Sequence, residues 1–259
     1  MLADGASNWL GLWTLYAREV RRFAKVYNQT IIAPMVTTLL FLAVFALALG
    51  ANSDPVKHAE YLQFLAPGLV MMAIAQNSFA NTSSSIVIAK VQGNIVDTLM
   101  PPLNAHELTF GMAMGGATRG MVVGVVASLA MTVFVPLHIY DMAAMLYFAF
   151  TASLLLSLLG LAGGIWAEKF DHIASVTNFI VVPLSFLSGT FYSVERLPPF
   201  FRTLAHFDPF FYMIDGFRFG WTGNADMDPT LGVVVLAVSC AALWWLCHRM
   251  FATGYKLKA

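Results

Sequence analysis

Few side chains in this chain have the types and spacing that catalysis or metal binding needs. The six histidines are scattered without metal-ligand spacing, at His58, His106, His138, His172, His206 and His248. The sequence holds no G-x-x-x-x-G-K-[ST], no G-x-G-x-x-G, no G-x-S-x-G and no H-E-x-x-H. We therefore predict no catalytic residue, no metal site and no cofactor bound by this chain.

Arg119 is the one charge placed well inside an apolar segment. An ionisable residue within a membrane is a functional hypothesis by default. The interpretation we favour is different: residues 109–118 lie at cytoplasmic depth, so that Arg119 reaches the inner interface with its long side chain. Carboxylates are rare inside the apolar segments, although an ion-driven carrier usually needs them near the middle of the membrane. The energy for any transport is therefore expected to come from elsewhere.

A polar run interrupts the second apolar segment between Gln76 and Ser85. Asn77, Asn81 and Ser84 or Ser85 fall on one helical face. Two interpretations stay open, because such a face either forms hydrogen bonds between helices or forms the wall of a wetted pathway.

The segment 90–108 predicts a short helix in a loop. Ile95, Val96, Leu99 and Met100 form a small apolar face, and Pro101-Pro102 stops the helix. Asp97 points to another side. A short helix of this kind is typical of a docking element for a soluble partner.

The stretch from Pro183 to Arg218 is apolar, yet glycine and proline interrupt it repeatedly. It contains Ser188-Gly189, Pro198-Pro199, Asp208-Pro209 and Gly216-x-Arg218. These breaks predict two short helices, roughly 199–207 and 210–222, each too short to cross about 30 Å of hydrocarbon. We expect a re-entrant hairpin over about 196–222, with Arg218 satisfying carbonyls or a carboxylate such as Asp215.

Composition indicates that the chain lies in a membrane rather than in water. The chain is 59% hydrophobic and 11% charged, with a mean hydropathy of +0.72, whereas a soluble domain is about 25% charged. The net charge of zero argues against a nucleic-acid partner. We predict an all-α integral membrane protein with six transmembrane helices. The expected spans are 30–50, 61–85, 109–136, 143–166, 173–192 and 229–251.

An amphipathic elbow helix is expected ahead of the first span, within a cytoplasmic interfacial segment 1–28; the transmembrane domain then covers 29–259. Aromatic residues alternate there with Arg18, Arg21, Arg22 and Lys25. The excess of basic residues on this side predicts that both termini are cytoplasmic. In the third span, glycines from Gly111 to Gly124 predict close helix packing, with a partner helix from this chain or from another.

These residues together resemble the type-2 ABC transporter permease family, the membrane subunits of type V exporters, in its nodulation-factor-export/YadH-like branch. The resemblance covers the elbow helix, six spans, the 90–108 loop in the coupling-helix position, and the string from Pro183 to Arg218. One departure is Asp97, where many relatives carry Glu. The resemblance implies an inner-membrane homodimer, in contact with membrane lipids, with two copies of a separate ATPase subunit that binds ATP and magnesium.

The family likeness also assigns expected roles to residues. Contacts with the ATPase are expected from Arg18, Arg22, Asp97, Thr98, Leu99 and Lys169. A substrate pathway between two copies is expected to include Thr37, Phe41, Phe45, Asn77, Asn81, Phe179, Pro183 and Phe186. An outer gate is expected from Gly189, Phe191, Tyr192, Pro198, Pro209 and Arg218.

The leading functional hypothesis is therefore an ATP-driven exporter of an amphipathic, lipid-linked or drug-like substrate. A secondary active carrier is the first alternative, and it predicts an ion-coupling carboxylate at mid-membrane, which spans one, two, four, five and six lack. A membrane-embedded lipid-modifying enzyme is the second, and it needs an acid, base or metal cluster that the scattered histidines do not supply.

Overall fold

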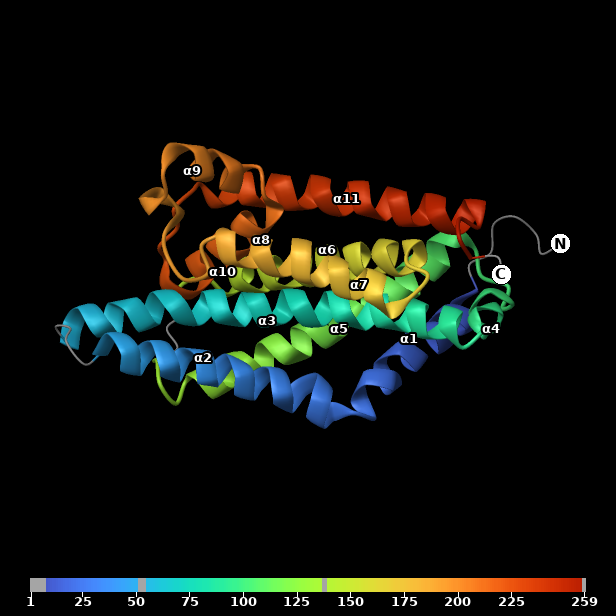
Figure 1. Cartoon of the computed structure of the whole chain (residues 1–259), viewed down its shortest axis with the longest axis horizontal. Helices are drawn as coiled ribbons and strands as arrows, with labels where there is room; N and C mark the ends of the chain where they lie inside the picture. The colour runs from blue at the N-terminus through green and yellow to red at the C-terminus, as the bar shows by residue number, and fades with distance from the viewer. Residues whose placement is uncertain (1–7, 51–54, 137–138, 258–259) are drawn as a thin grey trace.

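The computed structural model describes residues 8–50, 55–136 and 139–257, and this part of the chain consists of helices and their connections, with no strand (Figure 1). The α-helices are α1 (Trp9–Ala24), α2 (Ala33–Gly50), α3 (Pro55–Val91), α4 (Ile95–Leu99), α5 (Ala105–Met131), α6 (Met142–Trp166), α7 (Phe170–Val176), α8 (Val182–Leu187), α9 (Pro199–His206), α10 (Pro209–Thr222) and α11 (Pro229–Thr253). Two π-helical turns, η1 (Asn28–Ile32) and η2 (Thr177–Val181), and one 3₁₀ turn, η3 (Val194–Arg196), complete them.

Six helical segments of the described chain are long and apolar enough to cross a membrane. They are Asn28–Ala48, Val56–Val91, Ala105–Met131, Met142–Trp166, Phe170–Leu187 and Pro229–Thr253. The prediction of an all-α protein with six spans is confirmed. The helix ends differ from the expected ones: the third span ends at Met131 rather than 136, and the fifth ends at Leu187 rather than 192 because Gly189 takes a left-handed φ of +83°.

The central helix is α3, which packs against α2, α5, α6 and α10. Its 37 residues make it about 55 Å long at 1.5 Å per residue, well beyond the expected 61–85 and beyond the hydrocarbon thickness of about 30 Å. Of its apolar window, 72% is buried, against 11% for the first span and 11% for the fifth. The first and fifth spans therefore leave most of their apolar surface for lipid or another chain.

Glycines let neighbouring helices of the bundle approach one another closely. A Cβ on Gly160 of α6 would lie 2.4 Å from the carbonyl oxygen of Phe79 on α3. A Cβ on Gly115 of α5 would lie 2.5 Å from Cβ of Glu19 on α1. The small-residue seam of the third span therefore packs against helices of this same chain, which answers the question that the sequence left open.

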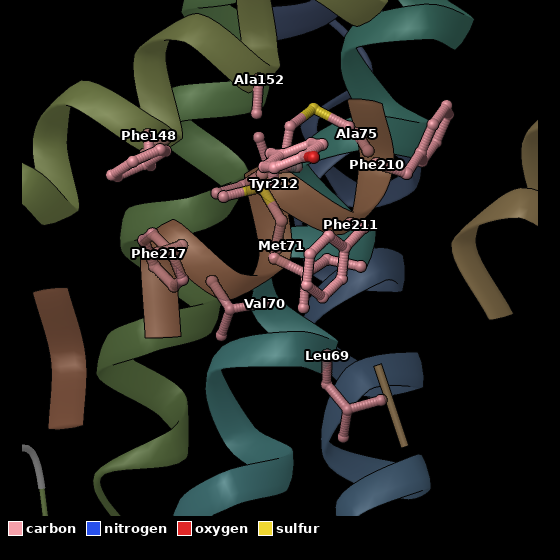
Figure 2. Packing of buried hydrophobic residues seen from close by; sticks show 14 of the residues in the cluster. Leu69, Val70, Met71, Ala75, Phe148, Ala152, Phe210, Phe211, Tyr212 and Phe217 are labelled. Carbon is pink, nitrogen blue, oxygen red and sulfur yellow. The ribbon is translucent and has the colours of Figure 1, made fainter. Parts of the chain in front are cut away.

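The two short helices predicted between the fifth and sixth spans are present as α9 and α10. Pro199 and Pro209 stand at their first positions, where a missing N–H costs nothing. The aromatic residues of α10 insert between α3 and α6, and Phe211 and Phe217 are each 1% exposed (Figure 2). The α9–α10 pair lies at one end of the bundle, whereas α1, α4 and the end of α11 lie at the other (Figure 1).

Candidate functional site

A groove opens between α1 and α4, beside the last turns of α3. Its cavity volume is about 710 Å³. Basic and polar side chains line it, among them Arg18, Arg21, Arg22, Lys25, Gln92 and Asp97. The amphipathic pattern of α1 accounts for this arrangement, because Leu15 and Phe23 are buried while Arg18 and Arg21 are exposed.

Glu19 fixes the position of α1, and it is 1% exposed. Its carboxylate accepts hydrogen bonds from Arg22 Nη2 at 3.1 Å, from Arg18 Nη2 at 3.3 Å and from Ser85 Oγ of α3 at 2.9 Å. The sequence analysis missed this residue. Its spacing was the available signal, since Glu19 stands four residues from both buried Leu15 and buried Phe23.

A second set of contacts fixes the start of α1. The backbone N–H of Asn8 donates to Glu107 Oε1 at 2.7 Å, while the Asn104 N–H donates to Glu107 Oε2 at 2.8 Å. Asn104 also caps α5 by accepting from the Glu107 N–H at 2.9 Å. The first turn of α1 is therefore fixed to the first turn of α5.

The residues expected to contact an ATPase divide into two groups. Asp97 and Lys169 are exposed and Leu99 is half-buried, so these three are open to a partner. Thr98 is buried and accepts a hydrogen bond from Arg18 Nη1 at 3.2 Å. Arg22 turns inward, donating to Glu19 and to Asn81 of α3.

The end of α6 is held near the same face of the bundle. Glu168 accepts a hydrogen bond from Lys256 Nζ at 2.8 Å. That hydrogen bond and the charge of Lys256 hold the pKa of Glu168 below its usual range. The segment after α11 is thereby joined to the connection between α6 and α7, next to Lys169.

The polar face of α3 meets two arginines on successive turns. Arg22 Nη2 donates to Asn81 Oδ1 at 3.0 Å, and Arg119 Nη2 of α5 donates to Asn77 Oδ1 at 2.8 Å. Arg119 follows Thr118, whose Oγ1 lies 3.0 Å from the Tyr16 hydroxyl of α1, and the interpretation that Arg119 extends to the inner interface stays a prediction. Ser85 Oγ, on the same face, donates to Glu19 of α1 at 2.9 Å, so this face forms hydrogen bonds between helices.

A smaller cavity of about 290 Å³ lies between η1–α2 and α3. Thr37, Phe41 and Asn77, three of the residues expected in the pathway, line it together. Asn81 does not line it, because it lies beneath Arg22 and is 0% exposed.

The other expected pathway residues lie apart from this cavity. On η2 and α8, Phe179, Pro183 and Phe186 are exposed. Phe45 packs against Phe191, with ring centroids 5.2 Å apart. Phe191 joins the cavity wall to this exposed face, because its ring centroid lies 6.4 Å from that of Phe41 and 5.1 Å from that of Phe186.

Residues of the expected outer gate connect α3, α8 and α10. Arg218 Nη2 donates to the Gly189 carbonyl at 2.7 Å, its Nε donates to the Phe64 carbonyl at 3.3 Å, and its Nη1 lies 3.9 Å from Asp215 Oδ1. This confirms that Arg218 satisfies carbonyls and faces Asp215. Phe191 stacks on Phe186 at 5.1 Å.

The remaining members of this set stand at turns. Pro198 caps α9 and Pro209 begins α10, while the Tyr192 hydroxyl donates to the Phe186 carbonyl at 3.2 Å. The sequence analysis missed the hydrogen bond from Ser188 Oγ to Asp208 Oδ2 at 2.6 Å, which joins the end of α8 to the start of α10.

Comparison with known proteins identifies the family. The family model described as ABC-2 type transporter matches residues 11–220, which includes the groove, α9 and all but the last two residues of α10. The chain belongs to the ABC-2 type transporter family.

Relatives in this family match the chain over nearly its full length. The chain is similar to the inner membrane transport permease YadH of Escherichia coli K12, at 34% identity over 97% of this chain and 98% of that protein. It is also similar to nodulation protein J of Rhizobium leguminosarum bv. trifolii, at 25% identity over 92% of this chain and 90% of that protein. The chain is thus the membrane permease of an ABC-2 type transporter, and an ABC ATPase is the partner that this family implies.

Proposed function

We propose that this permease is half of the membrane part of an ATP-driven exporter, in which two copies bind two copies of a separate ATPase. The groove between α1 and α4 carries this proposal. It is open, it presents the exposed Asp97, and it is joined to the polar face of α3 through Arg22 and Glu19. ATP and magnesium belong to the partner, and this chain supplies the contact surface.

The groove end of the bundle is assigned to the cytoplasm. The first helix carries Arg18, Arg21, Arg22 and Lys25, and such clusters of basic residues stay on the cytoplasmic side. The amphipathic α1 is then the elbow helix at the inner interface, and both termini are cytoplasmic. The α9–α10 pair becomes the re-entrant hairpin of the outer side, where it covers the exit.

The second copy is placed against the first and fifth spans. These spans are 11% buried each and present large exposed side chains, including Phe41 at 37%, Phe179 at 81% and Phe186 at 40%. Contiguous apolar surface of this kind is covered by lipid or by a partner. A pathway between two copies, walled by spans one, two and five, suits an amphipathic, lipid-linked or drug-like substrate moving outward.

Replacing Asp97 by arginine is expected to lower transport and substrate-stimulated ATP hydrolysis at least tenfold, without loss of membrane insertion. The exposed carboxylate of the docking element would become a cation, and a reversed charge that meets like charge across an interface costs several kcal/mol. The measurement is ATP hydrolysis and transport by the reconstituted complex.

Asp171→Arg is the matched control, because Asp171 is also an exposed aspartate but lies on α7, outside the groove. We expect it to retain activity. Normal coupling in Asp97→Arg would show that α4 is not the docking element.

A further inference from the structure

Arg119 carries a charge in the middle of α5 that no acidic group balances. Its Nη2 donates to the neutral amide oxygen of Asn77, and its buried Nε has no hydrogen-bond partner. Among residues 8–50, 55–136 and 139–257, no carboxylate forms an ion pair with it. The charged group that acts on it is Arg22, which has the same sign.

Such an arrangement is costly in a protein interior. Arg119 is half-buried, and a charge that is partly removed from water is normally paired with an opposite charge. A guanidinium has five N–H donors, and Asn77 occupies one of them. The Nε of Arg119 therefore still lacks a partner, and an anion would supply one.

Asn77 connects Arg119 to the cavity between α2 and α3. The Asn77 side chain lines this cavity together with Gln29, Thr37 and Gln76. Arg119 is not part of the cavity wall but contacts Asn77, which is, and Phe41, Leu69 and Met72 make another part of the wall apolar. A molecule with a charged head and an apolar tail matches both parts.

We infer that Arg119 binds the phosphate group of an amphipathic substrate that enters through this cavity. A phosphate oxygen replaces Asn77 Oδ1 on Arg119 Nη2, and the planar guanidinium offers further donors to the same group. Arg22 of α1, which contacts Asn81 one turn from Asn77 on α3, is already paired with Glu19, so the guanidinium of Arg119 is the group that binds the phosphate. This inference rests on the proposed export function and names its substrate class as phosphate-bearing amphiphiles.

The competing explanation is that Arg119 only clamps α5 to α3. The two explanations differ for Asn77→Ala. If Arg119 only clamps the two helices, Asn77→Ala lowers the stability of the protein, and dodecyl phosphate does not stabilise either protein. Under phosphate binding, the same change frees Nη2 of Arg119, so that phosphate affinity stays the same or rises while the stability of the ligand-free protein falls.

The test measures thermal unfolding of the full chain in maltoside micelles, with dodecyl phosphate added. We expect a saturable rise in Tm for the unaltered protein. Arg119→Gln should weaken the apparent affinity at least tenfold, Arg119→Lys should weaken it less, and Asn77→Ala should preserve or strengthen it. Arg249→Gln, which removes an exposed arginine of α11, is the charge-matched control and should bind normally.

Two further additions distinguish the sources of the effect. Dodecyltrimethylammonium should give no stabilisation, and inorganic phosphate should protect far less than dodecyl phosphate. Equal protection by inorganic phosphate would overturn the assignment to an amphiphile. Unchanged affinity in Arg119→Gln, or lost affinity in Asn77→Ala, would overturn the site itself. If Arg119→Gln does not fold, Arg119→Lys and Asn77→Ala still decide. This test uses no ATPase. A negative result therefore does not bear on the proposed ATPase docking, and loss of ATPase docking does not bear on phosphate binding.

Discussion

Replacing Glu19 by alanine should release α1 from α3 and α5 and abolish capture of the ATPase. The carboxylate is 1% exposed and accepts from Arg22, Arg18 and Ser85. Removing one partner of a buried ion pair costs about 3–5 kcal/mol. We expect the lower end of that range, because the Arg22 side chain is 31% exposed.

Thermal unfolding in detergent and limited proteolysis of the first 27 residues measure this effect. We expect a clearly lower Tm and faster cleavage within α1. Arg21→Ala is the control for stability, because Arg21 is exposed on the same helix. A Glu19→Ala protein as stable and as protease-resistant as the Arg21→Ala protein would show that the buried carboxylate does not hold α1.

Replacing Gly189 by valine should impair export more strongly than it impairs assembly. Gly189 has a φ of +83°, and a Cβ there would lie 3.1 Å from Val194 Cγ2 and 3.2 Å from the Tyr192 carbonyl oxygen. A β-branched residue in this region costs about 1–3 kcal/mol. The turn would shift, and with it the carbonyl that accepts from Arg218. Transport in reconstituted vesicles should fall at least fivefold while membrane insertion continues.

Gly254→Val tests whether the effect belongs to this turn. Gly254 also has a positive φ, +67°, but it follows the end of α11, at the opposite end of the bundle from α9 and α10 (Figure 1). The two variants share backbone strain and differ in place. Equal losses of transport in both would mean that general strain, rather than the α8–α10 turn, limits export.

The sequence predicted those features that depend on local rules. Long apolar runs gave the six spans, and the prolines at 199 and 209 gave the two short helices. Arg218 was matched with Asp215 because the two stand one helical turn apart. The short helix predicted in the 90–108 loop is present as α4. Its expected apolar face is divided, however, because Ile95 is buried and Val96 is exposed.

Features that depend on distant pairs were not predictable. Glu19 and Ser85 are 66 residues apart, and Arg119 and Asn77 are 42 apart. No periodicity in one segment reveals which polar residue of another segment will face it. The close approach of α1 to α5 depends on Gly115, whose role appears only when both helices are in place. The inward turn of Arg22 was missed for the same reason.

If the groove between α1 and α4 binds an ABC ATPase, the two proteins should stay together during purification. The most direct measurement is co-purification of the full chain in mild detergent. We predict that an ATPase with a phosphate-binding loop co-purifies at one copy per permease, that Asp97→Arg and Glu19→Ala lose it, and that Asp171→Arg retains it. Recovery of the permease without an ATPase, or equal recovery of the ATPase with all three variants, would contradict the account.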